Sequence, residues 1–406
     1  MTALKSASEM PSGEMQRSEF AEELSKEKRY QNRSLPPRAR TARLLEKWVG
    51  MPLNIVEAFG SYVIVRPMNW ALRHFDGLSY KLEGTLLRRV LQHVIFPATL
   101  LFSLVFGFYL AGNKVTFDSI LTLALVPVVI GLYVAPLERL MPFSRNWLEG
   151  GNDTSVDLMM FVSGAFWNGF AKYLMQVLFI VSLVEILEPL GHGLWPSYLP
   201  GVVQVFLFIL VKDFFRYWLH RAMHEVPFLW RFHAAHHSVK RLYWLNGIRS
   251  HPIEVAGQAI LFAIPYALLQ PSAEIIMVSI LMQLSIGIFQ HSNIDLKLGF
   301  WEYIFSIGDN HRYHHYPNKE VGDSNYGGEF IVWDILFGTF HKVKGERPHD
   351  QIGIGTAPNY PMTMAGLLIA PFLPDQKVFG SRTSETTDSR PNNGSTMATL
   401  KSSVRE

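Results

Sequence analysis

The chain of 406 residues contains no cysteine, which excludes disulfides, thiolate nucleophiles, iron–sulfur clusters and cysteine-ligated zinc. Any metal ion must therefore be bound by histidine, aspartate or glutamate. Charged residues are also scarce, at 17% of the chain against roughly 25% in soluble globular proteins. Hydrophobic residues make up 49%, and the net charge of +3 gives no argument for nucleic-acid binding. This composition favours a membrane protein.

Five apolar segments favour a membrane protein, because a helix needs roughly 20 apolar residues, within a range of about 17–25, to cross the hydrocarbon core of a bilayer. The segments are residues 94–111, 120–137, 158–184, 199–211 and 255–294. Lys172 interrupts the third segment and Glu274 the last one. The first two segments are long enough, and the third is if its lysine faces protein or water. Pro271 divides the last segment, so we expect a helical hairpin that turns at Gln270-Pro271-Ser272. The alternative, buried core helices of a large soluble enzyme, does not account well for five such runs.

Basic residues in the connecting segments predict the orientation of these helices. If the basic N-terminal tail is cytoplasmic, residues 112–118, residues 188–199 and the turn near Pro271 lie outside. They contain a single basic residue, Lys114, whereas the opposite side is rich in arginine and lysine. Because cytoplasmic loops carry an excess of basic residues, we expect both termini in the cytoplasm.

The expected organisation has four parts. Residues 1–45 are a disordered polar tail, residues 46–90 an interfacial helix or a small cap, residues 91–341 the membrane domain, and residues 342–406 a mostly disordered C-terminal tail. The expected fold class is all-α, a multi-pass membrane helical bundle with a cytoplasm-facing metal site rich in histidine.

That site is predicted from the spacing of the histidines. Ten of the 15 histidines lie between residues 220 and 315. His220 and His224 are four residues apart, so on a helix they share a face. The pattern H-x-x-H-H occurs twice, in residues 233–237 and 311–315. In it we expect the first and fourth residues to share a helical face and the fifth to be turned by about 100°, so that one turn can bridge two metal ions.

These clusters supply eight imidazoles, or nine with His291. A zinc site needs three or four ligands, so eight or nine suit two ions, and imidazole-dominated binding leaves iron, zinc, copper or nickel. All three clusters lie at the ends of apolar segments and can converge at the cytoplasmic face. A metal site there would receive an apolar substrate from the bilayer.

Five further residues have weaker assignments. His251 either caps the following helix or contributes to the site. Asp213 lies seven residues before His220, about 20° off the same helical face, and either orients a ligand or pairs with Arg216 or Lys212. Glu254 and the pair Asp309-Asn310 are further candidates for orienting a ligand.

The motifs, in this order, resemble the fatty acid hydroxylase superfamily over about residues 200 to 341. This superfamily includes sterol desaturases, sterol methyl oxidases, fatty acid 2-hydroxylases and alkylglycerol monooxygenase. The segments that carry the resemblance are Asp213–Arg221, Leu229–Ser238, His251–Glu254, Gln290–Asn293, Asp309–His315, Asn325–Gly327 and Trp333–Thr339.

The resemblance implies a membrane hydroxylase or desaturase domain with a non-haem di-iron centre, which uses O2 and two electrons to hydroxylate or desaturate a lipid of the sterol, fatty acyl or alkylglycerol type. The ligands that it implies are His220, His224, His233, His236, His237, His311, His314 and His315, with His291. His251 and Asp213 are the candidates for a catalytic or orienting role.

The chain lacks the His-Pro-Gly-Gly motif of a fused haem domain, so a separate electron-transfer protein, cytochrome b5-like or ferredoxin-like, is implied. This absence favours the sterol desaturase or alkylglycerol branch. The location implied is the bacterial inner membrane or the endoplasmic reticulum.

Two other classes of protein remain open. A metal transporter would carry histidine and aspartate at the middle of its membrane spans, whereas these histidines lie at the ends of the spans. A zinc-dependent hydrolase would have a glutamate beside the first histidine, as in H-E-x-x-H, but His220-Arg-Ala-Met-His224 has none.

Overall fold

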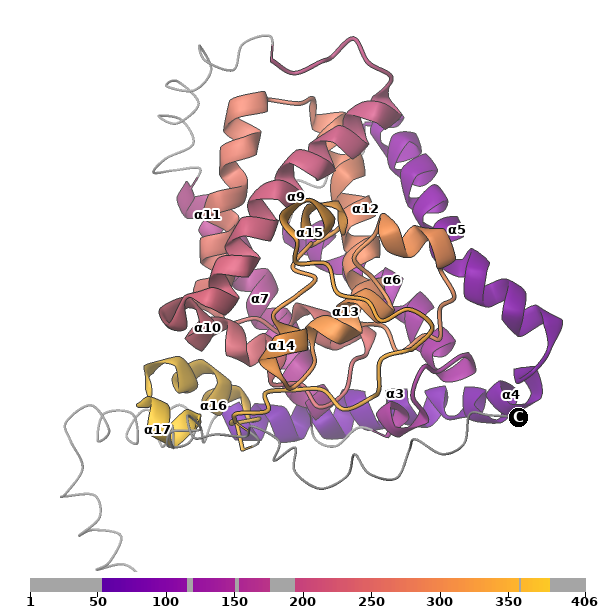
Figure 1. Ribbon diagram of the computed structural model, residues 1–406, viewed down its shortest axis with the longest axis vertical. Coiled ribbons are helices and arrows are strands. Elements are labelled where there is room, and N and C mark those ends of the chain that lie inside the picture. Colours follow the sequence, from indigo (N-terminus) through magenta and orange to yellow (C-terminus); the bar gives the residue numbers. More distant parts are fainter. Residues whose placement is uncertain (1–52, 115–119, 150–152, 176–193, 358, 380–406) are drawn as a thin grey trace, which may run out of the picture.

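The computed structural model describes residues 53–114, 120–149, 153–175, 194–357 and 359–379 (Figure 1). These residues are mostly helical and contain no β-strand, only two isolated bridges, Pro142 with Ile294 and Phe305 with Phe330. Residues 53–60 are helical as well. The elements that follow are η1 (Ser61–Val65), α3 (Arg66–Leu72), α4 (His74–Leu82), α5 (Leu86–Gly112), α6 (Ile120–Leu140), η2 (Arg145–Leu148), α7 (Asp153–Met175), α9 (Gly201–Glu225), α10 (Pro227–His237), η4 (Trp244–Ile248), α11 (Pro252–Leu269), α12 (Ala273–His291), η5 (Gly299–Tyr303), α13 (Asp309–His314), α14 (Lys319–Gly322), α15 (Val332–Phe337), α16 (Met364–Ile369), η6 (Ala370–Phe372) and α17 (Asp375–Val378).

Three of the described helices, α5, α11 and α12, are long and apolar enough to cross a membrane. The other predicted segments form α6, the part of α7 that the structure describes, and the first half of α9. The predicted hairpin is confirmed: Gln270 ends α11 in the left-handed conformation, with φ of 46°. The Ser272 side chain then accepts the Ile275 N–H and caps α12, so both helix ends at the turn are satisfied within three residues.

Helix α12 is the centre of the bundle. It packs against α5, α6, α9 and η4, and 67% of its apolar window is buried, against 22% for α11. A helix that is surrounded by others is apolar on every side, which is why the sequence of α12 shows no polar face. The main core lies around it and includes Phe96 of α5, Phe208 of α9 and Phe289 of α12.

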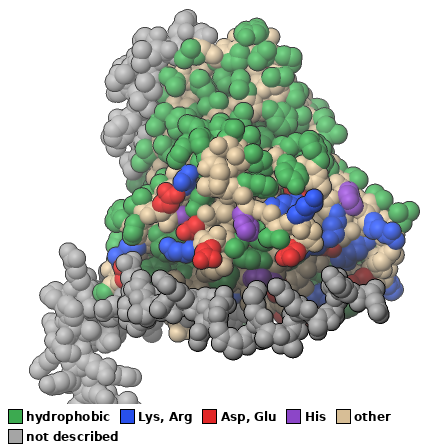
Figure 2. Space-filling view, viewed as in Figure 1, with side chains coloured by type: hydrophobic (Ala, Val, Ile, Leu, Met, Phe, Trp, Pro, Cys, Tyr) green, Lys and Arg blue, Asp and Glu red, His purple; other side chains and the backbone are tan. Residues whose placement is uncertain are grey.

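On the face of the molecule shown in Figure 2, most charged side chains gather in one half. Figure 2 shows hydrophobic side chains over the upper half and most of the charged ones below. The exposed apolar residues of α5 include Leu101, Phe102 and Val105. Such a continuous apolar surface is typical of helices that face lipid. The histidine-bearing helices α10 and α13 lie in the charged half (Figure 1).

The first described residues, for which the sequence predicts an interfacial helix or a cap, form η1, α3 and α4, which follow one another at the base of the bundle (Figure 1). Their largest apolar side chains point outward: Phe59 is 67% exposed and Trp70 is 79% exposed. Asp76 of α4 pairs with Arg139 of α6 at 3.0 Å, which fixes this segment to the bundle. Residues 1–45, expected to be a disordered tail, lie outside the described residues.

The C-terminal part differs from the expectation. Residues 342–406 were expected to be mostly disordered, yet residues 342–357 and 359–379 fold onto the bundle and include α16, η6 and α17. Met364 and Leu367 are buried in one cluster with Val156 and Met160 of α7. The physical reason is the apolar run of residues 362–370, which is long enough to cover α7. The remainder, residues 380–406, lies outside the described residues.

Close packing between α6 and η4 gives a stability prediction. A Cβ atom at Gly131 would lie 2.1 Å from the nearest atom of the Trp244 ring, whereas one at Gly257 of α11 would meet nothing within 4 Å. We expect Gly131→Ala to lower the free energy of unfolding by about 1–3 kcal/mol, as overpacking does. Gly257→Ala should be neutral or stabilising by up to about 1 kcal/mol. Thermal unfolding of the two variants in detergent tests this; equal melting temperatures would contradict it.

Candidate metal centre

Three helices and one helix end bring nine histidines together at the polar side of the bundle. Helix α9 carries His220 and His224, whose ring centroids are 5.3 Å apart. Helix α10 carries the first H-x-x-H-H pattern, α13 and the residue that follows it carry the second, and His291 is the last residue of α12. The hairpin returns α12 to the side from which α11 starts, which places His291 beside the other rings. All nine side chains are buried.

The nine rings form two groups, and within each group the ligand nitrogens lie within 4.8 Å of one another. We call them the five-histidine group and the four-histidine group. The first consists of His220, His224, His233, His237 and His314, and the second of His236, His291, His311 and His315.

Each H-x-x-H-H turn contributes to both groups, as predicted, but the pairing differs from the expectation. The first and fifth histidines stay together, as His233 with His237 and His311 with His315, and the fourth joins the other group. Four residues advance a helix by about 400°, only 40° from a full turn, whereas three residues leave a difference of 60°. The i, i+4 pair is therefore the better aligned one.

The ring nitrogens face each other at distances that suit a shared ion. The Nε2 atoms are 3.1 Å apart in His220–His233 and in His224–His237. They are 3.2 Å apart in His315–His291 and in His315–His311. Two nitrogens at about 2.0–2.1 Å from one ion lie about 2.8–3.4 Å apart at right or tetrahedral angles. The geometry of both groups thus fits one metal ion each.

Hydrogen bonds set the tautomer of six rings. Each has an oxygen acceptor at Nδ1, so Nδ1 donates and Nε2 keeps its lone pair for a metal. The pairs are His220 with the Tyr326 carbonyl at 2.7 Å, His224 with Asp323 Oδ1 at 3.0 Å, His233 with Glu254 Oε1 at 3.0 Å, His236 with the Arg249 carbonyl at 3.1 Å, His291 with Asn246 Oδ1 at 2.9 Å, and His314 with the Ser324 carbonyl at 2.7 Å.

Burial keeps the rings neutral. Loss of hydration lowers the pKa of His233, His236 and His314 to about 3, so the uncharged form that binds metal prevails at neutral pH. The His314 Nε2 atom is buried and has no hydrogen-bond partner among the described residues. A buried polar atom without a partner is costly, and an ion in the five-histidine group would satisfy this one. The donor set therefore fits a metal centre.

Asp213 lies close to the site but does not bond a histidine. Its carboxylate accepts the backbone N–H groups of Gly328, Glu329 and Phe330 at 2.9–3.0 Å. These three bonds are neither of the two contacts that the sequence suggested for Asp213, a bond to a histidine ligand or an ion pair with Arg216 or Lys212. Arg216 forms an ion pair with Glu329 at 2.8 Å. Asp213 thus fixes the loop whose Tyr326 carbonyl accepts the His220 N–H, and its predicted catalytic role remains a prediction.

His251 belongs to neither group of rings. Its Nδ1 accepts the Ile253 N–H and caps α11, and its Nε2 lies 3.2 Å from the Leu368 carbonyl. This is the capping role that the sequence left as one of two alternatives. The catalytic alternative remains a prediction.

Three of the six acceptors are side chains, and of these the sequence singled out one and missed two. Glu254 was a candidate and bonds His233. Asp323 was missed, although its position two residues before the Asn325-Tyr-Gly motif could have indicated it. Asn246 lies in η4 between two motifs and gives no signal in the sequence. Asp309 pairs with Arg312 at 2.8 Å, and Asn310 bonds the Glu302 carbonyl.

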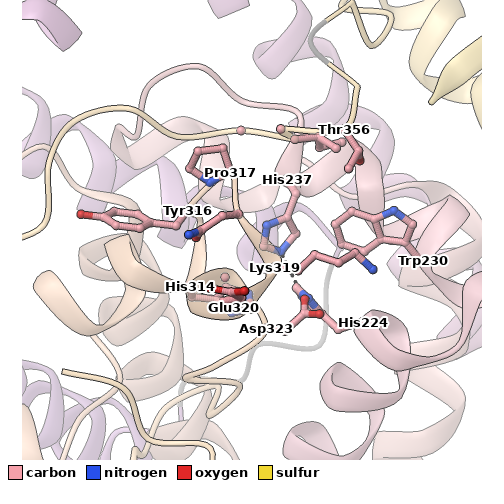
Figure 3. A pocket seen from close by; sticks show the side chains of 15 residues that line it. His224, Trp230, His237, His314, Tyr316, Pro317, Lys319, Glu320, Asp323 and Thr356 are labelled. Atoms are coloured by element: carbon pink, nitrogen blue, oxygen red, sulfur yellow. Dashed lines mark hydrogen bonds and ion pairs between the residues drawn. The ribbon is translucent and has the colours of Figure 1, made fainter. Parts of the chain in front are cut away.

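A cavity of about 460 Å³ adjoins the five-histidine group. Its lining includes three of the five rings, those of His224, His237 and His314, and no ring of the four-histidine group. Figure 3 shows Lys319, Glu320, Asp323 and Trp230 around the same space. Charged and aromatic side chains therefore both line the cavity beside the rings.

Comparison with known proteins agrees with the resemblance. Residues 205–339 match the family model described as fatty acid hydroxylase. An ornithine lipid hydroxylase of Rhizobium tropici is 32% identical over 210 residues, which are 51% of this chain and 63% of that protein. A human alkylglycerol monooxygenase is 34% identical over 128 residues, 32% of this chain and 28% of that protein.

A methylsterol monooxygenase of Aspergillus fumigatus is 28% identical over 188 residues, 41% of this chain and 60% of that protein. The chain thus spans less than two thirds of the length of these relatives. No solved structure matches it significantly. The predicted resemblance to the fatty acid hydroxylase superfamily is confirmed by these matches.

The three N–H groups held by Asp213 give a second stability prediction. Asp213→Ala would leave these buried donors unpaired, so we expect the free energy of unfolding to fall by about 3–5 kcal/mol. The control is Asp375→Ala, which removes the partner of Arg231 from a half-exposed ion pair and should cost less than about 1 kcal/mol. Denaturation in detergent measures both; equal losses would contradict the role given to Asp213.

Proposed function

We propose that this chain, which carries a fatty acid hydroxylase domain at residues 205–339, is a membrane-bound non-haem di-iron oxygenase that hydroxylates a lipid. The observation that carries the proposal is the pair of buried histidine groups, one of five and one of four rings, in each of which the ligand nitrogens lie within 4.8 Å of one another. The named relatives are hydroxylases and monooxygenases, which favours hydroxylation over desaturation.

Iron is the metal that best suits both the ligands and the reaction. Nine imidazoles exceed the needs of a tetrahedral zinc site, and the relatives named as monooxygenases perform redox chemistry that zinc does not support. Two bound iron ions would supply the activation of O2 towards an unactivated C–H bond, with two electrons from a separate cytochrome b5-like or ferredoxin-like protein.

The protein's own residues position this chemistry. The Nδ1 acceptors, among them Glu254 and Asp323, hold the rings so that Nε2 points inward. The nine rings are at most 8% exposed, so most of their surface is shielded from bulk water. Asp213 positions His220 indirectly, because it fixes the loop whose Tyr326 carbonyl accepts the His220 N–H.

The substrate class follows from the membrane setting and the relatives. The relatives' names refer to ornithine lipid, alkylglycerol and methylsterol, which are all lipids. The exposed apolar surface of α5 would face the lipid, and the histidine groups lie towards the charged half of the molecule (Figure 2). This arrangement supports a substrate that reaches the site from the bilayer.

The proposed arrangement is multi-pass, with both termini and the histidine groups on the cytoplasmic side of a bacterial inner membrane or of the endoplasmic reticulum. The loop charges and the three apolar helices support it. The segment with Phe59 and Trp70, both strongly exposed, would lie in the membrane interface, where aromatic rings are favoured.

The competing classes receive less support. The rings lie at the ends of α9, α10 and α12 and in α13 rather than at the middle of a span, which disfavours a transporter. The relatives are oxygenases rather than hydrolases.

Replacing one ring tests the proposal. His236→Ala removes a nitrogen from the four-histidine group, so we expect lower iron content and a loss of lipid-dependent O2 consumption of roughly 100-fold or more, by analogy with the 10–100-fold cost of changing the partners of a ligand. The control is His93→Ala, which should keep both, because His93 is an exposed residue of α5 whose ring bonds the Arg89 carbonyl and belongs to neither histidine group. Iron analysis and an oxygen electrode measure the two quantities; if both variants keep full iron and full activity, the oxygenase proposal fails.

The orientation has its own test. Reporter domains inserted after Lys240 and after Pro348 should both be found on the cytoplasmic side, because the segments between α10 and α11 and beyond α15 carry the excess of basic residues. Reporters on opposite sides would refute the proposed topology.

A further inference from the structure

The two histidine groups differ in more than the number of rings. We propose that the five-histidine position holds its metal ion more tightly than the four-histidine position, and that Asp323 is a positioning residue for this difference. The inference rests on the proposed two-metal centre and states which of its two positions binds the metal ion more tightly.

The first support is the ligand set. The five-histidine group offers one more nitrogen, and each added imidazole contributes a bond to the ion. The Nε2 atoms of His224 and His237 lie 3.1 Å apart, as do those of His220 and His233. These two contacts join four different rings, whereas the two close contacts of the four-histidine group both involve His315. More of the five-histidine group is therefore in place before an ion binds, so less reorganisation is needed.

The second support is the charge behind the rings. Asp323 Oδ1 lies 3.0 Å from Nδ1 of His224, and Glu254 Oε1 lies 3.0 Å from Nδ1 of His233. A carboxylate bonded to the far nitrogen makes the imidazole a stronger donor and places negative charge near the cation. Two of the five rings have such a partner.

The four-histidine group has neutral partners instead. His236 bonds the Arg249 carbonyl and His291 bonds the Asn246 amide oxygen. Nδ1 of His311 and of His315 is buried with no hydrogen-bond partner among the described residues. No ring of this group is hydrogen-bonded to a carboxylate in the part of the chain that the structure describes. Glu254 acts on His236 through space without a hydrogen bond, so the ion of this group gains less from its surroundings.

Access to solvent alone would predict that the five-histidine position holds its ion less tightly than the four-histidine position. The cavity of about 460 Å³ meets three rings of the five-histidine group and none of the other, and Asp323 stands at its edge beside His224 (Figure 3). If solvent access decided, the five-histidine position would be the first to lose its ion. The proposal therefore has to be tested at equilibrium, where the ligands and the charges decide.

The experiment uses the full-length protein loaded with ferrous iron under anaerobic conditions and equilibrated against a series of chelator-buffered iron concentrations. Iron per chain should fall in two steps with a plateau at one ion. Asp323→Asn should weaken the more tightly held ion by about 10–100-fold and leave the weaker step unchanged. The matched control is Glu320→Gln, which lines the same cavity and should reproduce the wild-type curve.

Two ligand variants assign the steps. His311→Ala should leave one ion at the affinity of the tighter step, and His237→Ala should abolish that step. A wild-type curve without a plateau, or an effect of Asp323→Asn on the weaker step, would overturn the inference while leaving the two-metal centre intact. A saturated wild-type protein with fewer than two ions would instead contradict the proposed function, and the inference with it.

Discussion

The arrangement of this protein depends on the burial of nine neutral imidazoles at one place. A buried ring nitrogen without a partner costs about 1–3 kcal/mol, so a cluster of nine is stable only if the outer nitrogens are bonded and the inner ones meet a cation. Six of the outer nitrogens have oxygen acceptors, drawn from η4, α11 and the residues after α14. The inner nitrogens lie close together in two groups. The bonded outer nitrogens and the grouped inner nitrogens both indicate that the rings are arranged to bind cations.

The bundle supplies these acceptors through its topology. The α11–α12 hairpin starts and ends at the polar side, so Glu254 near its beginning and His291 at its end reach the same site. Asp213 of α9 holds the loop of residues 328–330 by three backbone bonds. The buried pair of Arg249 and Asp157 connects α7 to the segment that carries the His236 acceptor. Helices α7, α9, α11 and α12 therefore each supply a polar contact or a ring to the site.

The sequence predicted the helices and the nine histidines because both follow local rules. Apolar runs of a given length and rings at i, i+4 spacing are visible without a fold, and the turn at Pro271 is a property of three adjacent residues. The outer partners were harder to predict, since most of these bonds join distant parts of the chain: Asp323 is 99 residues from His224, and Asn246 is 45 residues from His291. The folding of Met364 and Leu367 onto α7 likewise depends on a distant surface.

The central claim is that the two groups of rings hold a pair of iron ions, and X-ray absorption at the iron edge of the purified protein tests it most directly. The account predicts two iron ions per chain, nitrogen ligands at about 2.0–2.2 Å, close to the metal–imidazole distances known for zinc, no sulfur ligand, and a second iron as a neighbouring scatterer. A protein that holds a single iron ion per chain, or only zinc when iron is supplied, would contradict it.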